Sequence, residues 1–162
     1  MAVAGFIIRR ATVLDAGGIL NCLAAAFEPY RTSYTPAAYL DTVLSPETIS
    51  QRLQSMQVFV ALSSQSEVIG SIACAIADRN EGHLRGMAVV PEFQGHKIAE
   101  SLLHVAEEEL RRLGYSRITL DTTEPLLRAV RFYERHGYRR SGKVTDFFGM
   151  PLHESTGKHR AA

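Results

Sequence analysis

The chain has 162 residues, 46% of them hydrophobic and 22% charged, and its formal net charge at pH 7 is +1. This length favours one domain, which we expect over residues 1–156, followed by a loose tail at 157–162. Acidic and basic residues are interspersed, so the composition argues against a nucleic acid or a charged membrane as the main partner.

The cysteines and the hydropathy bear on the cellular compartment. Cys22 and Cys74 lie far apart and form no CxxC motif, so we expect reduced, buried thiols and neither a disulfide nor a zinc site. The first charged residues follow the apolar stretch near the start, which is the reverse of a secretory signal. No apolar run is long enough to span a bilayer. These features predict a cytoplasmic protein with no membrane partner.

The first half of the chain is predicted to alternate strands with short helices. The expected elements, in chain order, are a strand at 6–10, a helix capped by Asp15 and ended by Pro29, a polar aromatic loop at 30–36, helices at 37–44 and 46–53, and strands at 57–62 and 67–77. The run of strands before the next helix indicates an antiparallel meander that leads into a crossover.

Residues 84–99 read as a strand that passes through a tight turn into a helix. Alternating side chains predict a strand at 84–90, and Pro91 cannot continue a sheet ladder. From about Gly95 the apolar residues recur at helical spacing. Backbone N–H groups at the start of such a helix are unpaired and favour an anion, so we expect a phosphate or pyrophosphate at residues 94–99.

The second half continues the α/β pattern. The long helix is expected to end at Gly114, and two i,i+4 Glu–Arg pairs on its outer side predict that residues 107–109 form a solvated face. A strand at 117–122 should lie parallel to the strand at 84–90 through a right-handed crossover. The remaining predicted elements are a helix begun by Thr123 and Pro125 and strands at 138–141 and 144–148.

Two blocks of sequence have a characteristic order and spacing. The run MAVVPEFQGHKIA at residues 87–99 combines a hydrophobic strand, a turn with Gln94 and the start of a long helix, and RAVRFYERHGY follows at residues 128–138. Together they resemble the acetyl-CoA signature and the second block, Ala-x-x-Phe-Tyr-x-x-x-Gly-Phe/Tyr, of the GNAT N-acetyltransferases. The chain departs from that family at Lys97, where glycine is usual, and at Leu126, where asparagine is frequent.

The resemblance implies both a fold and an activity. The fold is α/β, with a central, mostly antiparallel sheet of six to seven strands, a splayed parallel pair and helices on both faces. The activity is transfer of an acetyl group from acetyl-CoA to a primary amine, directly and in a ternary complex. The residues expected at the cofactor are Met87, Ala88, Val89, Gln94, Gly95, His96, Lys97, Ile98 and Ala99. No metal ion is expected.

The same resemblance assigns Tyr133 as the acid that protonates the departing sulfur, because a phenol is protonated at neutral pH. Core packing is the alternative interpretation of that side chain. Glu81 and His83, at the start of the central strand, are the candidate bases, since an alkylammonium has a pKa of about 10 and must lose a proton. A glutamate in a surface turn and a structural histidine are the alternatives. His153 and Glu154 are further candidates.

The amine is expected opposite the cofactor, as a small-molecule substrate. Tyr30, Arg31 and Tyr34 are candidate contacts for a small polar or carboxylate-bearing amine, and an ordinary surface loop is the alternative. A protein N-terminus or lysine is the alternative acceptor, and a non-catalytic acyl-CoA sensor of the same fold is the alternative function. A homodimer is left open. We interpret neither His96 nor His104 as a metal ligand.

Overall fold

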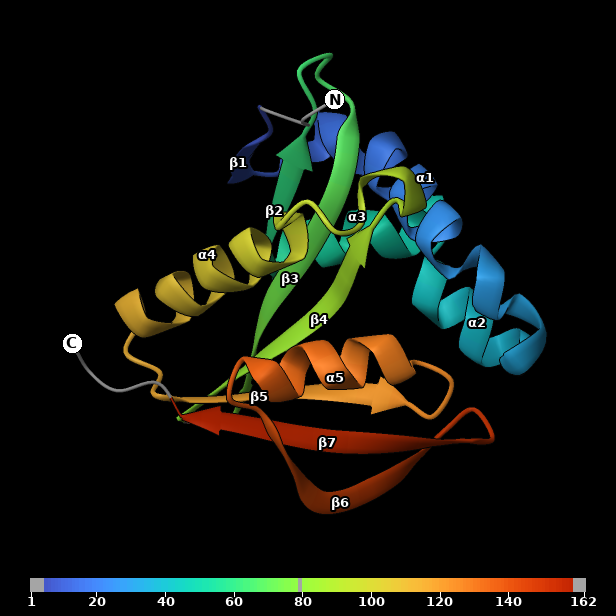
Figure 1. The fold of residues 1–162 in the computed structure, drawn as a ribbon, viewed down its shortest axis with the longest axis vertical. Helices are drawn as coiled ribbons and strands as arrows, with labels where there is room; N and C mark the ends of the chain where they lie inside the picture. The colour runs from blue at the N-terminus through green and yellow to red at the C-terminus, as the bar shows by residue number, and fades with distance from the viewer. Residues whose placement is uncertain (1–4, 79, 159–162) are drawn as a thin grey trace.

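A twisted sheet carries helices on both of its faces (Figure 1). The computed structural model describes residues 5–78 and 80–158. In chain order the elements are β1 (Ile7–Arg10), η1 (Val13–Asp15), α1 (Ala16–Phe27), η2 (Glu28–Ser33), α2 (Pro36–Val43), α3 (Pro46–Ser55), β2 (Gln57–Leu62), β3 (Val68–Asp78), β4 (Glu81–Val89), η3 (Pro91–Phe93), α4 (Ile98–Arg112), β5 (Arg117–Thr123), α5 (Leu127–Arg135), β6 (Arg139–Phe147) and β7 (Met150–Lys158), where η denotes a 3-10 helix.

The described strands lie in the order β1-β2-β3-β4-β5-β7-β6. Neighbours are antiparallel except β4 and β5, so the expected sheet with one parallel pair is confirmed.

The helices form a layer on each face of the sheet. α4 packs across β2, β3 and β4, and α5 lies over β5 on the same face (Figure 1). α1 contacts β3 and β4, and α3 packs beside α1 and β2. One apolar core therefore lies under α4 and α5, and a second lies between the sheet and the pair α1 and α3. Within the described residues, no helix combines the length and the apolarity needed to cross a membrane.

The sequence of α4 explains its orientation. Its buried apolar side chains recur every three or four residues, as Ile98, Leu102, Leu103, Ala106 and Leu110. The arginines of its last turn pair with glutamates three residues earlier rather than four, as Glu108–Arg111 and Glu109–Arg112. The prediction of a solvated face is wrong for Glu107, which is buried and accepts a hydrogen bond of 2.7 Å from Tyr138. Glu107 lies one turn after Leu103 and therefore faces the sheet.

The start of α1 differs from the expected cap. Thr12 caps the preceding 3-10 turn, and the side chain of Asp15 does not cap α1. The Asp15 carboxylate instead accepts hydrogen bonds from the Arg9 guanidinium at 2.8 and 3.0 Å and from the N–H of Thr12 at 2.8 Å. The hydrogen bonds from Arg9 are the main reason that the pKa of Asp15 is lowered. The loop expected after α1 is largely the 3-10 helix η2.

The C-terminal strands differ most from the prediction. The two strands expected at 138–141 and 144–148 are the single strand β6, whose pairing with β7 shifts register around Gly142. β7 lies between β5 and β6 and is not predicted by the sequence pattern. It includes residues 157 and 158, so the prediction that the tail begins at 157 is wrong, and residues 159–162 lie outside the described chain. β7 escapes the pattern because polar residues dominate it and its alternation is weak.

The parallel pair separates along its length. β4 and β5 are paired only between residues 81–84 and 117–120, although β4 continues to Val89 and β5 to Thr123. The register of β4 with β3 shifts around Gly86, which has φ +63°. A positive φ favours glycine, and a bulge bends the strand that contains it. The gap that opens between the two strands is called the β4–β5 wedge below.

Candidate functional site

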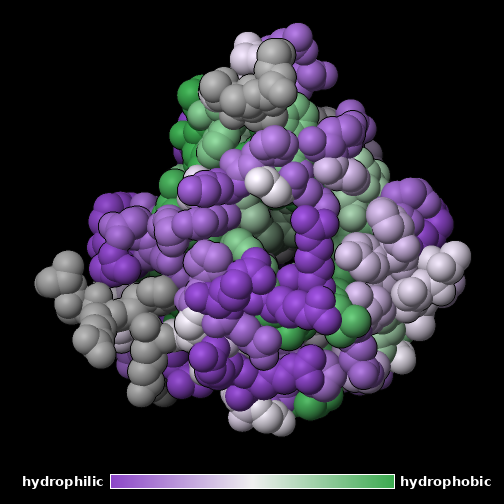
Figure 2. Space-filling view, in the orientation of Figure 1, coloured by the Kyte–Doolittle hydropathy of each residue, from purple (hydrophilic) through white to green (hydrophobic). Residues whose placement is uncertain are grey.

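A cavity of about 480 Å³, called the main cavity below, opens at the β4–β5 wedge. Its walls come from both strands, the turn after β4, α5, and from η2 and α3. Figure 2 shows a hollow near the centre of the face that carries α4 and α5, with a hydrophilic rim and apolar residues inside. Of the residues expected at the cofactor, the wall contains Met87, Ala88, Val89, Gln94, Gly95, Lys97, Ile98 and Ala99. His96 is exposed and is not part of the wall.

The turn between β4 and α4 carries backbone donors beside this cavity. Within the described chain, no protein acceptor takes the N–H groups of residues 95–99. Unpaired amides and the positive end of the α4 dipole make this turn suitable for an anion. Lys97, the N-cap of α4, has left-handed backbone with φ +66°. That conformation costs a non-glycine residue roughly 1–2 kcal/mol, so Lys97 occupies a backbone position that glycine would adopt with less strain.

Gln94 connects the two sides of the cavity mouth. Its side-chain amide donates to the carbonyl oxygen of Val89 at 3.2 Å, and its amide oxygen accepts a hydrogen bond from Arg128 at 2.9 Å. Arg128 belongs to the first turn of α5, so this contact crosses the wedge. Leu126 lines the cavity with an apolar side chain. Position 126, where we expected asparagine to be frequent, is therefore apolar, and Arg128 supplies a polar group two residues later.

Tyr133 lies in the apolar core and also lines the main cavity. Burial raises the pKa of Tyr133 above its ordinary value, so its phenol stays protonated through the neutral pH range. Thr122 on β5 lines the same cavity, and its buried hydroxyl has no partner among the described residues. A buried hydroxyl without a partner is unfavourable, so a ligand in the wedge would gain from bonding to Thr122.

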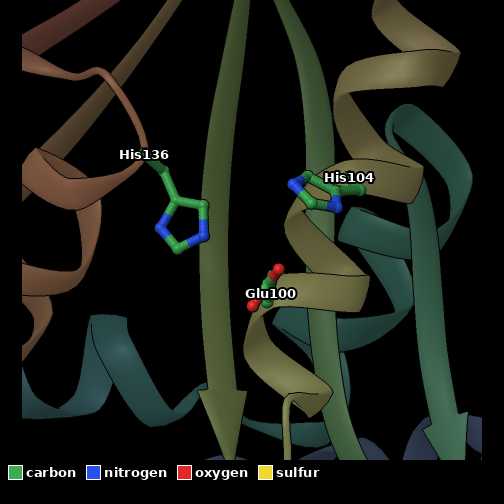
Figure 3. A group of neighbouring side chains, drawn as sticks. All are labelled: Glu100, His104 and His136. Carbon is green, nitrogen blue, oxygen red and sulfur yellow. The ribbon is translucent and has the colours of Figure 1, made fainter.

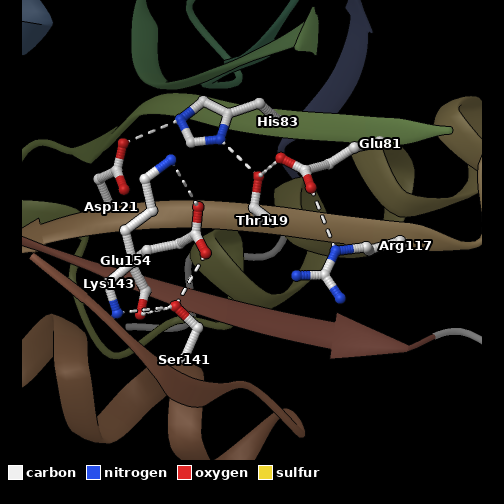
Figure 4. A network of polar contacts seen from close by, with 8 residues as sticks. All are labelled: Glu81, His83, Arg117, Thr119, Asp121, Ser141, Lys143 and Glu154. Carbon is white, nitrogen blue, oxygen red and sulfur yellow. Dashed lines mark hydrogen bonds and ion pairs between the residues drawn. The ribbon is translucent and has the colours of Figure 1, made fainter. Parts of the chain in front are cut away.

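A chain of polar contacts crosses the paired end of β4 and β5 (Figure 4). His83 contacts Asp121 through Nε2 at 3.2 Å and the hydroxyl of Thr119 through Nδ1 at 2.7 Å. Thr119 donates to Glu81 at 3.1 Å, and Arg117 donates to Glu81 at 3.1 Å. The parallel register produces this chain, because it sets His83 opposite Thr119 and Glu81 opposite Arg117.

The direction of these hydrogen bonds defines what His83 can do. Thr119 has one hydroxyl proton, and when it gives that proton to Glu81 its oxygen accepts from Nδ1 of His83. The other ring nitrogen, Nε2, faces Asp121. This arrangement suits a ring that accepts a proton at Nε2, beside a carboxylate, and that is linked to Glu81 through Thr119.

The structure separates the candidate bases. His83 and Asp121 line both the main cavity and a smaller cavity of about 180 Å³, whereas Glu81 lines the smaller cavity and not the main one. Glu154 lines the smaller cavity, and His153 lines neither. Asp121 was not identified from the sequence, although it lies within the strand predicted at 117–122 and shares a face with Thr119 by alternation.

Two arginines line the main cavity on the side of α3 and β4. Arg52 comes from α3 and Arg85 from β4. Burial and, secondarily, the positive charge of Arg85 lower the pKa of Arg52 to about 10. Within the described residues, neither guanidinium takes part in a hydrogen bond or an ion pair. Neither arginine was identified from the sequence, where the only signal is that Arg85 and His83 share a face of the predicted strand.

The expected acceptor contacts divide into two groups. Tyr30 and Tyr34 line the main cavity, and the hydroxyl of Tyr34 lies 2.6 Å from that of Thr123. Arg31 does not line it. The guanidinium of Arg31 pairs instead with Glu28 at 3.2 Å and lies over a tyrosine ring of α2.

Glu100, His104 and His136 form a cluster between α4 and the end of α5 (Figure 3). One ligand atom of each residue lies within 4.8 Å of the others. Nδ1 of His136 lies 2.8 Å from the carbonyl oxygen of Phe132, which fixes the ring and leaves Nε2 available. Histidine nitrogens and a carboxylate are ligands that transition metals accept, so the structure places His104 in a group that could hold one, unlike its interpretation from the sequence.

Comparisons with known proteins agree with this geometry. Residues 21–138 match the model of the acetyltransferase (GNAT) family. The chain is 34% identical over 84 residues to an N-acetylaspartate synthetase of Danio rerio, which is 51% of this chain and 30% of that protein. It is 40% identical over 60 residues to an aminoalkylphosphonate N-acetyltransferase of Salmonella typhimurium, which is 37% of this chain and 39% of that protein. The matches therefore span less than half the length of either relative.

Solved structures share the fold over nearly the whole chain. The PaiA N-acetyltransferase of Thermoplasma acidophilum, crystallised with coenzyme A, superposes with a TM-score of 0.80 at 19% identity. The match covers 96% of this chain and 99% of that one. At this identity the likeness establishes the fold and leaves the chemistry to the residues of the main cavity.

Proposed function

Because the chain belongs to the acetyltransferase (GNAT) family, we propose that it transfers an acetyl group from acetyl-CoA to the primary amine of a small molecule, directly and in a ternary complex. The observation that carries this proposal is the β4–β5 wedge beside a turn whose amides have no protein acceptor within the described chain. Where the sheet opens, the strand edges are available to the extended arm of an acyl carrier. The start of the helix beside this opening is available to the phosphates of the same carrier.

The residues present fit an acyl-CoA. The amides of residues 95–99 suit a pyrophosphate, and Arg128 would add a guanidinium once its contact with Gln94 is exchanged. The main chain around Met87 and the hydroxyl of Thr122 lie where β4 and β5 no longer pair, and they suit the amides of the pantetheine arm. When bound, acetyl-CoA supplies a thioester whose carbonyl carbon the amine attacks.

The wedge also supports the proton transfers. His83 accepts a proton from the substrate ammonium at Nε2, with Asp121 beside it, and the Thr119 hydroxyl links its other nitrogen to Glu81. Tyr133 holds a proton that it gives to the departing sulfur, because its phenol remains protonated at neutral pH. Backbone N–H groups near the bulge of β4 donate to the carbonyl oxygen as negative charge develops on it.

Two observations support a small-molecule acceptor. The names of both curated relatives refer to small molecules, N-acetylaspartate and aminoalkylphosphonates. The main cavity also provides a short polar amine with charged partners, since Asp41, Arg52 and Arg85 line it together with Tyr30 and Tyr34. A peptide amine is the competing acceptor and forms one arm of the test.

The test measures cofactor binding and turnover separately. Acetyl-CoA at about 100 times its Kd should stabilise the full chain by about 2.7 kcal/mol in thermal unfolding, coenzyme A should act similarly, and acetate should have no effect. Thiol release from acetyl-CoA is then measured with amino acids, polyamines, aminoglycosides, aminoalkylphosphonates and short peptides. No thermal shift at millimolar acetyl-CoA would refute the proposal, and release with peptides alone would assign a protein acceptor.

A further inference from the structure

We infer that Arg52 and Arg85 form an anion subsite in the main cavity, and that the acceptor amine therefore carries a carboxylate or a phosphonate. This inference rests on the proposed acetyl transfer and adds the chemical class of the acceptor. Three features of the structure carry it: the position of Arg52, the balance of charges around Arg52, and the spacing between Arg85 and His83 along β4.

The local backbone makes room for the guanidinium of Arg52. A Cβ atom at position 86 would overlap Nη1 of Arg52, so Gly86 is the residue that lets the guanidinium lie against the bulge of β4. The Arg52 side chain is mostly removed from solvent, which lowers its pKa to about 10. Holding a partly buried cation without a partner is unfavourable, which indicates that a ligand supplies the missing charge.

The charges around the subsite favour an anion. The positive charge of Arg85 lowers the pKa of Arg52, and the carboxylate of Asp41 acts on Arg52 in the opposite direction. Asp41 forms no ion pair with either arginine within the described residues. Two guanidiniums facing one carboxylate leave a local excess of positive charge. The planar fork of an arginine matches the oxygens of a carboxylate or a phosphonate.

The subsite is separate from the turn proposed for the pyrophosphate. Arg52 belongs to α3, which packs beside α1 on the face of the sheet opposite α4. The free amides lie at the start of α4 instead. An anion held by Arg52 and Arg85 is therefore a group of the acceptor and not a phosphate of the cofactor.

The spacing along β4 limits the length of the acceptor. His83 and Arg85 are two residues apart on one strand, so their side chains share a face and lie roughly 7 Å apart along it. A molecule whose ammonium reaches His83 and Asp121 while its anion meets Arg85 has only a few bonds between the two groups. Short amino acids and short aminoalkylphosphonates satisfy this limit.

The test compares amines that differ only in the anion. Thiol release is measured with 2-aminoethylphosphonate against ethanolamine, and with β-alanine against β-alaninamide. For the native protein we expect kcat/KM to favour the acidic member of the preferred pair by about 10- to 100-fold, the range for hydrogen bonds to charged groups. Arg52→Gln and Arg85→Gln should each reduce that ratio about 10-fold, and Arg52→Lys should restore part of it. Arg140→Gln, an exposed site on β6 outside both cavities, should leave the ratio unchanged.

Thermal unfolding separates a binding role from a structural one. Arg52→Gln removes an unpaired, partly buried charge, so the melting temperature of the free protein should stay equal or rise. A lowered melting temperature with an unchanged ratio would make Arg52 structural and overturn the inference. Thiol release with a ratio near one would also overturn the subsite while the transferase function stands. If no amine releases thiol and acetyl-CoA gives no thermal shift, the proposed function itself fails.

Discussion

Replacing Tyr133 by phenylalanine removes one hydroxyl from the wall of the main cavity and keeps the ring that packs in the core. The ring of Tyr133 makes edge contacts with Phe132 and Tyr138, at centroid distances of 5.4 and 5.9 Å, and phenylalanine preserves both. Burial is the cause of the raised pKa of Tyr133. We therefore expect the free energy of unfolding to change by less than about 1 kcal/mol, and the affinity for acetyl-CoA to stay within about twofold.

The expected effect on turnover follows from the leaving group. A positioned acid contributes about 10²- to 10⁴-fold to a rate, and a thiol with a pKa of about 8.5 is a fairly good leaving group without help. The lower end of that range applies, so kcat at pH 7 should fall by about 10- to 100-fold, with KM for acetyl-CoA nearly unchanged. The assay is steady-state thiol release between pH 6 and pH 9, together with the thermal shift that acetyl-CoA produces.

A neighbouring tyrosine provides the matched control. Tyr138→Phe removes the hydrogen bond that Tyr138 donates to the buried carboxylate of Glu107, which should cost about 1.5–3 kcal/mol of stability. Tyr138 does not line the main cavity, so its replacement should leave kcat unchanged below the melting transition. A Tyr133→Phe variant with kcat within twofold of the native value would refute the acid role. A loss of kcat that accompanies an equal loss of acetyl-CoA affinity would assign Tyr133 to binding instead.

Three further predictions concern the scaffold. Lys97→Gly should raise the free energy of unfolding by about 0.5–1 kcal/mol in urea titrations, because glycine tolerates the left-handed backbone at the start of α4 but loses more entropy on folding. Asp15→Asn should lower it by about 1–2 kcal/mol at pH 7, because Arg9 donates to both carboxylate oxygens and an amide offers one acceptor oxygen and no negative charge. The pKa of Asp15 is lowered in the folded state, so this stability is present above the unfolded pKa of about 3.9 and is lost as the pH falls through the lower, folded value. Cys22 and Cys74 are buried with pKa values raised to about 12, so a disulfide reagent should titrate them only after unfolding.

Each of these predictions has a clear contrary outcome. A destabilised Lys97→Gly would mean that the lysine side chain stabilises the turn by more than the left-handed backbone costs. An Asp15→Asn deficit that persists unchanged at pH 3 would show that the contacts of Asp15 do not depend on its charge. Rapid reaction of the native thiols would contradict their burial and would also disturb the thiol-release assay.

The local sequence was sufficient to predict elements whose apolar residues recur at one clear spacing, that of a helix or that of a strand. Pro91 and the apolar stripe from Ile98 to Leu110 mark the end of β4 and the course of α4 without reference to any other element. β7 was missed because it is held by pairing with β5 on one side and β6 on the other, and its own residues alternate weakly. Strands of that kind depend on their neighbours more than on their own hydrophobicity.

The candidate site was only partly predictable for the same reason. The turn at 94–99 and Tyr133 lie within contiguous blocks, so they could be identified from sequence spacing. The link from His83 to Glu81 through Thr119 depends on the register of β4 with β5, which connects residues 36 and 38 positions apart. The guanidinium of Arg52 lies against β4 at Gly86, a position that has no side chain to displace it. No local pattern encodes a contact of that kind.

The short pairing of β4 with β5 has a mechanical consequence. Only residues 81–84 and 117–120 join these two strands, so the sheet consists of two plates, β1–β4 and β5–β7, that meet along a short seam. A ligand bound beyond that seam, where β4 and β5 are not paired, contacts both strands and so links the two plates. Loading the protein should therefore stiffen it as a whole, and amide hydrogens on both sides of the gap, far from any catalytic group, should exchange more slowly with solvent once the gap is filled.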